Sequence, residues 1–396
     1  MTPRFDVLYT SLITGLIGFS AITAWADDTV SQSAAASTAS LSPTTDYTAR
    51  RSDAITHEID FRVVVTPPYH CQSLKVWLPL PTSDAGQEIG PSELSSFPVN
   101  VEPQVGVEPV YGNKFACFEF DHPQGAQIIT HRFTAKVWNL DWDLTPSRVT
   151  KPTVWPESFH PYLQPQAIRQ ETEFAAVLHQ LTPQRNDPTG DLNSAMDWVN
   201  QHLAYDHVHA SLQADANHAF EQRRGHCSDY HGLCATMGRR LGHPTRVTYG
   251  LSLFPKNSPS HCKLEAYLPP YGWVSYDLSE TQKLIARIGQ DENLGPVQRQ
   301  QLVHAAQDRL HQGFRENSWL LLTRGTNYDL VPPASRPVQV VRTIFAEADG
   351  IPLPEPDPAN GKQREFSWMT AHRFESDTEL PRPFQDYRTL SADPRN

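Results

Sequence analysis

The sequence predicts an α+β protein, with a β-sandwich ahead of a core that combines helices and antiparallel strands. Residues 53–140 contain short runs, such as 59–65, in which apolar and polar side chains alternate. Alternating runs separated by Pro, Gly and Asn clusters are typical of a β-sandwich. Helical patterns over 168–242 then precede strand patterns over 245–278, an order that favours α+β. The 34 Pro residues, against a usual share of about 5%, argue against a helical bundle.

The elements of the core can be placed from apolar periodicity and turn residues. One helix pattern holds Ile168, Phe174, Val177 and Leu178, and another holds Leu192, Met196, Val199 and Leu203. A third helix is expected from near Gly225 to Gly242, because Gly followed by Pro244 is a usual helix end. The later expected elements are strands at 245–253, 261–268 and 272–278, a helix at 296–311 and further strands within 319–345.

The N-terminus is typical of an export signal. Arg4 precedes an uncharged stretch over 7–24, and Ala24-Trp25-Ala26 supplies the small-x-small pattern for cleavage after Ala26. The alternative is an uncleaved membrane anchor, since the stretch approaches the roughly 18 residues that span a bilayer. The Gly, Ser and Thr content favours removal. We therefore expect a periplasmic or extracellular protein, with no membrane span after signal removal.

The remaining organisation follows from composition. The expected parts are a signal peptide (1–26), a disordered linker (27–52), a β-sandwich (53–145), a core domain with C-terminal strands (146–350) and a partly ordered Pro-rich tail (351–396). The net charge of −11, without a long basic run, excludes nucleic acid as an expected partner. Cys71 and Cys117 are predicted either to form a disulfide or to be two buried thiols. With five Cys in all, at least one is unpaired within the monomer.

Cys227 is a candidate nucleophile because it falls in the first turn of the helix after Gly225. A helix N-terminus presents unpaired N–H groups and a partial positive charge, which stabilise a thiolate. The same N–H groups are suited to hold an oxyanion. The alternative is a buried structural Cys.

His261 and Asp277 supply the partners that such a nucleophile needs. The two-residue strand period places His261 on the polar face of its strand. Pro269-Pro270 lies midway between the two residues, so a hairpin centred there sets His261 opposite Asp277. The carboxylate would orient the ring, and its other nitrogen would exchange a proton with Cys227. A surface His–Asp pair is the alternative.

These residues lie in three blocks that resemble the core motifs of the bacterial transglutaminase-like superfamily. GHCSDY at 225–230 is similar to G-x-C-x-D-[FY], and RLGHPTRV at 240–247 to R-x-G-I-P-A-R-V. HCKLEAY, followed by GWVSYD ending at 277, is similar to H-x-W-x-E-x-Y and G-W-x-x-x-D. Weaker likeness extends over most of 55–350. The resemblance implies a papain-like core, with a nucleophile helix packed on an antiparallel sheet and a Cys227, His261 and Asp277 triad.

One position departs from the superfamily pattern. Lys263 stands where a Trp is usual, which would alter substrate access or charge preference without removing a triad member. Lys263, His226 and Trp273 are expected to line the substrate cleft, Trp273 by packing beside the triad strand. The side-chain donor to the oxyanion is not assigned.

The expected reaction is attack of the Cys227 thiolate on an amide or ester carbonyl of a protein or peptide, giving a thioester. Water would then give hydrolysis and an amine would give cross-linking; hydrolysis is favoured because bacterial members are often suspected proteases or amidases. No cofactor is required. One alternative is a non-catalytic exported binding or assembly module with the same fold.

A second alternative is a Cys/His structural-metal protein. Its ligands would come from Cys227, His231, Cys234, His261 and Cys262, since Cys and His are zinc ligands. However, the chain has no CxxC pair, and the strand period turns Cys262 away from His261. Cys234 and Cys262 are therefore expected to be core thiols.

Overall fold

The computed structural model describes residues 41–181, 187–255, 259–355 and 368–390. It separates the chain into two units, Met1–Ser40 and Leu41–Asn396. The predicted signal peptide, the cleavage after Ala26 and most of the predicted linker fall in the first unit, outside the described residues. No helix in the described ranges combines the length and the apolar character that crossing a membrane requires.

Two antiparallel sheets form the predicted β-sandwich. The first sheet contains β1 (Arg50–Val65), β3 (Gln87–Phe97), β6 (Gln127–Asp141), β12 (Phe314–Arg315) and β16 (Trp368–Ser376). The second contains β2 (Ser73–Leu80), β4 (Gln104–Val107), β5 (Lys114–Asp121), β14 (Phe345–Ala348) and β15 (Ile351–Pro352). Alternate side chains of both sheets, such as Phe61, Val76 and Phe118, meet in one apolar cluster. Burial of this shared face holds the layers together.

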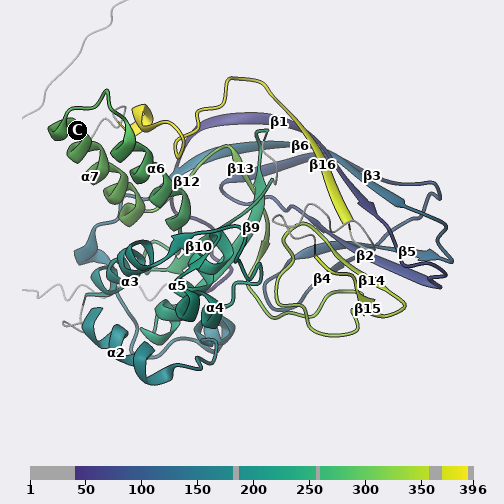
Figure 1. Ribbon diagram of the computed structural model, residues 1–396, viewed down its shortest axis with the longest axis horizontal. Coiled ribbons are helices and arrows are strands. Elements are labelled where there is room, and N and C mark those ends of the chain that lie inside the picture. Colours follow the sequence, from purple (N-terminus) through teal and green to yellow (C-terminus); the bar gives the residue numbers. More distant parts are fainter. Residues whose placement is uncertain (1–40, 182–186, 256–258, 356–367, 391–396) are drawn as a thin grey trace, which may run out of the picture. The chain divides into compact units, whose positions relative to one another are not determined.

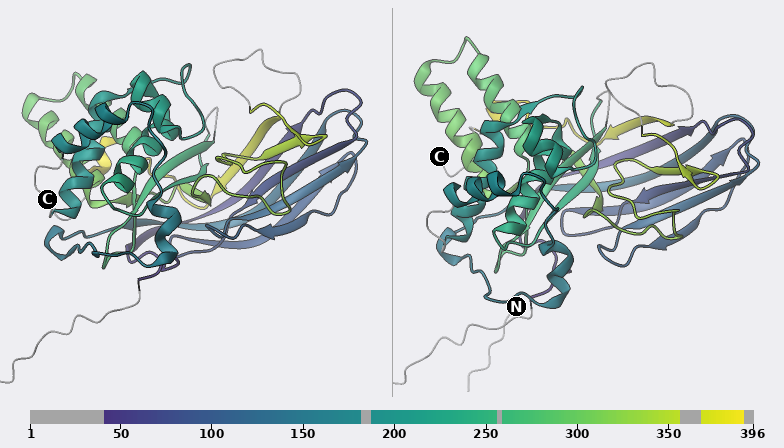
Figure 2. Two further views of the ribbon diagram at one scale, coloured as in Figure 1. Left: turned by 90° about the horizontal axis from the view of Figure 1, so that it is seen from below. Right: turned by 60° about the horizontal axis from the view of Figure 1, so that its bottom comes forward.

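The sandwich draws strands from both ends of the described chain. β16 pairs along β1 from His57 with Ser376 to Val65 with Trp368, and β14 pairs with β2. In Figure 2 the yellow strand from the end of the chain lies at the edge of its sheet, beside the purple strand β1. The prediction that the sandwich is confined to 53–145 is therefore wrong. The predicted tail, 351–396, contributes the strands β15 and β16. Cys71 and Cys117 are free, buried thiols.

The predicted linker is too long at its C-terminal end. β1 begins at Arg50, and Tyr47 is already buried. The Tyr47 hydroxyl donates a hydrogen bond to Glu265 Oε1 over 2.6 Å. Residues 41–52 therefore belong to the folded unit, and hydrogen bonds of Pro43, Asp46 and Thr48 to the core add to that of Tyr47.

A third antiparallel sheet carries the core, in the order β11-β10-β9-β13. Its strands are β9 (Thr245–Ser252), β10 (Ser260–Tyr267), β11 (Trp273–Tyr276) and β13 (Trp319–Arg324). The helix α5 (Cys227–Arg240) packs on β9 and β10. Its side chains Tyr230, Leu233 and Met237 share one apolar cluster with Leu264 and Tyr276 of the sheet. This arrangement confirms the predicted helix packed on an antiparallel sheet.

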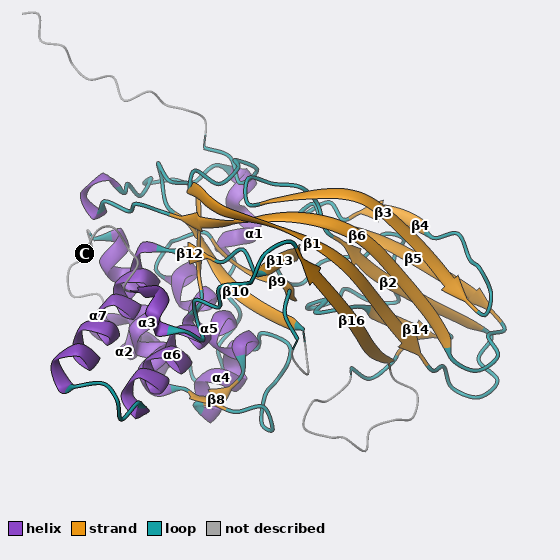
Figure 3. Ribbon diagram, turned by 90° about the horizontal axis from the view of Figure 1, so that it is seen from above, coloured by secondary structure: helices purple, strands orange, loops and turns teal. Residues whose placement is uncertain are grey.

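The other helices surround α5. Those predicted are α2 (Glu171–Leu181), α3 (Pro188–His202) and α7 (Pro296–Gln312), and those missed are α4 (Ala216–Gln222) and α6 (Leu278–Gln290). The short elements are α1 (His160–Leu163), β7 (Ala204–Tyr205), β8 (Arg224–Gly225) and the 3-10 turns Pro146–Arg148, Glu157–Phe159 and Tyr387–Leu390. Figures 1 and 3 show α2, α3, α5, α6 and α7 grouped together, with the long strands β1, β3 and β6 extending away from them.

Candidate active site

The start of α5 holds Cys227 at the first helical position. His226 is the N-cap, and its Nδ1 accepts a hydrogen bond from the backbone N–H of Ser228 over 3.1 Å. The Asp229 carboxylate in turn accepts from the backbone N–H of His226 over 3.0 Å, which completes a capping box. Gly225 has a φ of +155°, and a Cβ there would collide with the Asp229 carboxylate. The GHCSD motif is therefore a helix start that fixes the position of Cys227.

The surroundings of Cys227 favour the thiolate although the residue is only 8% exposed. A hydrogen bond from the Cys262 thiol is the largest influence that brings the pKa of Cys227 well below its usual value, against the effect of burial. A hydrogen bond and the charge of His261 act in the same direction. Burial lowers the pKa of His226 to about 4, so this ring is neutral near pH 7. We therefore assign the stabilisation of the Cys227 thiolate to Cys262 and His261.

His261 and Asp277 form the predicted pair. His261 Nε2 lies 2.6 Å from Asp277 Oδ2, and both residues are buried. Burial alone would lower the pKa of His261, but the charge of Asp277, the hydrogen bond between them and Cys227 raise it to about 9. His261 is therefore an imidazolium near pH 7, with Nε2 engaged by Asp277 and Nδ1 left for the sulfur.

The hairpin that brings His261 and Asp277 together has a different register from the predicted one. Leu264 pairs with Tyr276, so continuation of the ladder sets Lys263, rather than His261, opposite Asp277. The register is thus shifted by two residues. An even shift leaves every side chain on its own face of the sheet. His261 and Asp277 consequently meet on one face, as predicted, but diagonally rather than directly across.

The three residues predicted to line the cleft are buried. Lys263 is fully buried, and its Nζ lies 2.5 Å from Asp277 Oδ2, so it does not line an open cleft. Trp273 packs beside the triad strand, as predicted, but its ring lies beneath the Arg246 guanidinium at 3.9 Å. His226 is next to Cys227 in the chain, and its part in a cleft stays a prediction.

The face of β10 that carries His261 and Lys263 is polar, as predicted, yet it is covered by other segments. Glu265, on the same face, accepts hydrogen bonds from the Tyr47 hydroxyl and from Arg246 Nε, both over 2.6 Å. Charges can be buried in this way only when each finds a partner. The sequence pattern showed the charges but not the distant partners that neutralise them.

Cys262 lies nearer to the start of α5 than the sequence indicated. It is fully buried, as predicted, but α5 covers its face of β10. Its Sγ lies 3.9 Å from Ser228 Oγ, and Cys262 is the largest influence that lowers the pKa of Cys227. Tyr249 pairs with Cys262 in the ladder, and its hydroxyl lies 3.3 Å from Ser228 Oγ. Docking the predicted helix on the apolar face of the strand would have revealed these neighbours.

The geometry around His231 bears on the metal alternative. His231 Nε2 accepts a hydrogen bond from the backbone N–H of Leu278 over 3.1 Å, and its Nδ1 lies 3.4 Å from Cys262 Sγ. Both ring nitrogens therefore have partners within the protein. The described parts of the chain contain no group of three or more His, Cys, Asp and Glu residues placed to hold one metal ion.

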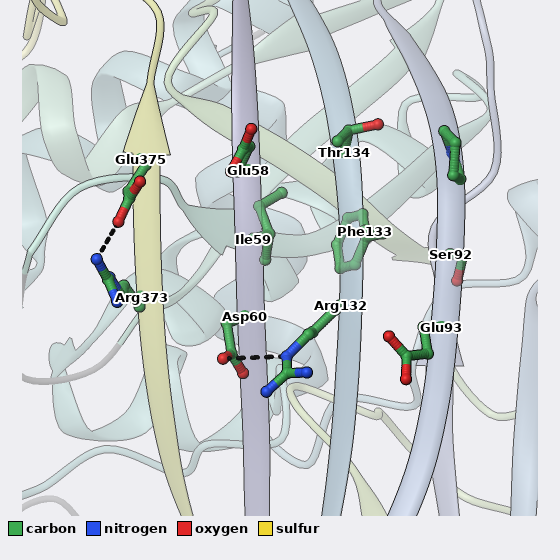
Figure 4. Close-up of a pocket in the computed structure, with 11 residues that line it drawn as sticks. Glu58, Ile59, Asp60, Ser92, Glu93, Arg132, Phe133, Thr134, Arg373 and Glu375 are labelled. Atoms are coloured by element: carbon green, nitrogen blue, oxygen red, sulfur yellow. Dashed lines mark hydrogen bonds and ion pairs between the residues drawn. The ribbon is translucent and has the colours of Figure 1, made fainter.

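Two hollows in the structure differ in size and in the residues that line them. The cavity beside His261, closed by Phe384 and Glu316, has about 20 Å³ of space, enough for about one water molecule. A larger hollow of about 390 Å³ lies on the outer face of β1, β3, β6 and β16. Figure 4 shows the Arg132–Asp60 ion pair and the Arg373–Glu375 contact in it. None of the predicted site residues lines this larger hollow.

The model of the transglutaminase-like superfamily matches residues 175–278, a range that includes Cys227, His261 and Asp277. The chain contains a transglutaminase-like domain. A relative from Haemophilus influenzae, named only as an uncharacterised protein, is 24% identical over 162 residues, which cover 35% of this chain and 42% of the relative. The matched region is thus less than half of that relative's length.

Solved structures resemble this chain at low sequence identity. One, described as a candidate cysteine protease from Cytophaga hutchinsonii, has 14% identity and a TM-score of 0.55, and covers 84% of this chain and 94% of its own. That likeness concerns the fold alone, and it agrees with the predicted fold class. The periplasmic domain of TgpA from Pseudomonas aeruginosa has 17% identity and a TM-score of 0.30, over 59% of this chain and 91% of its own.

Proposed function

We propose that this protein is an exported cysteine enzyme that acts on amide bonds through a thioester on Cys227. The observation that carries the proposal is the link from Asp277 through His261 to Cys227. A 2.6 Å contact holds His261 Nε2 on the carboxylate, and His261 and Cys227 act on each other's pKa, which is raised for the ring and lowered for the thiol. The fold and the three motifs support the same roles of nucleophile, acid–base group and orienting carboxylate.

The proposed reaction has two halves. The Cys227 thiolate attacks the amide carbonyl carbon, and His261 Nδ1 gives its proton to the departing nitrogen as the C–N bond breaks. The neutral ring then takes a proton from an incoming water or amine, which attacks the thioester and releases the thiolate. Asp277 keeps its charge throughout and supports the imidazolium.

His226 is our candidate for the side-chain donor in the cleft. Its Nδ1 accepts a hydrogen bond from Ser228, so the proton of the neutral ring sits on Nε2. Nε2 is buried and has no hydrogen-bond partner among the described residues. Buried N–H groups nearly always have a partner, so this one is suited to a substrate oxygen. With the first-turn amides of α5, it would stabilise the oxyanion.

The proposed substrate is a protein or peptide outside the cytoplasm, and hydrolysis is the favoured outcome. Export rests on the sequence of 1–26 alone. The test compares wild type with Cys227→Ala on a peptide mixture, with and without a fluorescent primary amine. We expect product from wild type alone, mostly without incorporated amine. Cys234→Ala is the matched control, since Cys234 is a fully buried thiol on the same helix. Equal product from wild type and Cys227→Ala would remove the proposal.

A binding module without turnover is the second candidate, and the enclosure of the site favours it. Cys227 is buried, and the cavity beside His261 has room for about one water molecule. Iodoacetamide labelling separates the two candidates. Selective labelling of Cys227 at neutral pH together with turnover supports the enzyme, and absence of both supports the binding module.

A further inference from the structure

Lys263 meets the same carboxylate oxygen as the candidate catalytic histidine. Its Nζ lies 2.5 Å from Asp277 Oδ2, and His261 Nε2 lies 2.6 Å from that oxygen. On its other side, Lys263 Nζ lies 2.8 Å from Glu316 Oε2. The four groups form a buried row of alternating charge, from His261 through Asp277 and Lys263 to Glu316.

Burial disfavours the positive charge of Lys263, and the carboxylates of Asp277 and Glu316 offset this cost, so that its pKa is raised. Its side chain is fully buried, and Nζ lies 5.3 Å from the centre of the Trp319 ring and 4.9 Å from that of Phe384. An apolar side chain in place of a buried ion pair is often neutral or stabilising. Stability alone therefore does not account for a lysine at this position, and its contact with Asp277 points to a role there.

We propose that Lys263 is a positioning residue that fixes the Asp277 carboxylate for His261 and sets how tightly the ring holds its proton. This inference rests on the proposed function. Asp277 Oδ1 is occupied by the backbone N–H of Glu280 at 3.1 Å, so Oδ2 is the oxygen left for both cations. The ammonium takes part of the carboxylate's charge, which leaves less of it to stabilise the imidazolium. His261 can then release its proton to the leaving nitrogen more readily.

Glu316 gives the arrangement a second point of control. Its carboxylate shares the charge of Lys263 and so limits the pull of the ammonium on Asp277. Neutralising Glu316 should strengthen that pull and make His261 a weaker base. Removing the Lys263 and Glu316 charges together should leave Asp277 to His261 alone and make the ring a stronger base. The two changes thus have opposite expected signs.

The comparison of the Lys263 and Glu316 variants requires that the other charged groups around His261 and Asp277 are unchanged. The charged or titratable groups that act on His261 or Asp277 from the packed elements are Cys227 and His231 of α5, Cys262 of β10, Tyr205 of β7, Glu280 of α6 and Arg309 of α7. The proposed variants change none of these side chains. A difference between variants therefore reports the Lys263 and Glu316 charges.

The experiment follows the pH midpoint of His261 in two ways. One is the upper limb of kcat/KM against pH, and the other is the imidazole titration by ¹⁵N-histidine NMR, assigned with His261→Gln. We expect Lys263→Met/Glu316→Gln to raise the midpoint, and Glu316→Gln alone to lower it, each by at least about half a pH unit. Lys263→Arg keeps the charge and should stay near wild type.

The outcomes separate the inference from the proposed function. Unchanged midpoints in folded Glu316→Gln and in the double variant overturn the role of Lys263, even when turnover depends on Cys227. If no turnover is found, the NMR titration still decides the inference, because the charges act on the ring without substrate. Should the double variant not fold, the downward shift in Glu316→Gln decides alone.

Discussion

His226 Nδ1 accepts a hydrogen bond from the backbone N–H of Ser228 over 3.1 Å. An imidazole thus takes the N-cap role that Ser, Thr, Asp or Asn usually fill. The cap holds the amides of the first turn in place, and it fixes the tautomer that leaves Nε2–H free. Helix start and proposed substrate contact therefore depend on one ring.

The cap can be tested by its effect on stability. His226→Ala removes the acceptor for Ser228 and should lower the free energy of unfolding by about 1 kcal/mol. His226→Asn keeps a side-chain acceptor and should lose clearly less. Urea unfolding of both variants measures the difference. Equal losses in the two variants would show that the hydrogen bond to Ser228 does not stabilise the helix start.

The pH dependence of turnover follows from the two shifted groups. The pKa of Cys227 lies well below its usual value, and that of His261 is raised to about 9. The active pair of thiolate and imidazolium thus exists up to about pH 9, above which His261 has no proton for the leaving nitrogen. We expect kcat/KM to be level through neutral pH and to fall above about pH 9. An upper limb near pH 6.5 would contradict the assigned pair.

Sequence periodicity was sufficient where the determinants are local. The position of α5 follows from the residues that end a helix. The shared face of His261 and Asp277 follows from the two-residue strand period and the turn between the strands. The hairpin register did not follow, because it depends on how the Pro269-Pro270 turn closes. The ladder fixes it with Leu264 opposite Tyr276.

Long-range pairings left no readable signal in the sequence. β16 pairs with β1 although some 300 residues separate them, and each strand alone shows only alternation. The superfamily pattern places Lys263 in the cleft, where a Trp is usual, and nothing near Lys263 in the sequence indicates its distant partner Glu316. Charges on a strand indicate a polar face, but whether water or another segment covers that face is decided by tertiary packing.

Tyr47 provides a test of where the folded unit begins. The Tyr47 hydroxyl donates a hydrogen bond to Glu265, which also accepts one from Arg246 Nε. Removal of the hydroxyl leaves the buried Glu265 carboxylate with fewer donors. Tyr47→Phe should lower the free energy of unfolding by about 1–3 kcal/mol, because the ring remains and only the hydrogen bond is lost. Thr45→Val, on the exposed stretch nearby, is the control. Thermal unfolding with no difference between the variants would show that the Tyr47 hydroxyl does not stabilise the folded unit.

Cys227 and His261 act in opposite directions on the pH dependence of the free energy of unfolding. A raised pKa gives His261 a contribution to stability that is full below 6.5 and is lost as pH rises toward about 9. A lowered pKa gives Cys227 a contribution that grows over the same window, because the unfolded thiol keeps its proton to about pH 9. Folded and unfolded states of wild type then bind equal numbers of protons at Cys227 and His261. The free energy of unfolding therefore does not change with pH through this pair.

Cys227→Ala removes the contribution of Cys227 to the pH dependence of stability and leaves that of His261. The folded variant still holds a proton on His261, since Asp277 remains, while its unfolded chain does not. Relative to wild type, its free energy of unfolding should fall as pH rises above 6.5, by up to about 1.4 kcal/mol per pH unit, over a window that ends below about 9 because Cys227 no longer raises the pKa of His261. Cys234→Ala should run parallel to wild type, because burial raises the pKa of Cys234 and its thiol stays neutral in both states. Urea unfolding across this window gives the curves. Parallel curves for wild type and Cys227→Ala would mean that Cys227 and His261 do not form an ion pair.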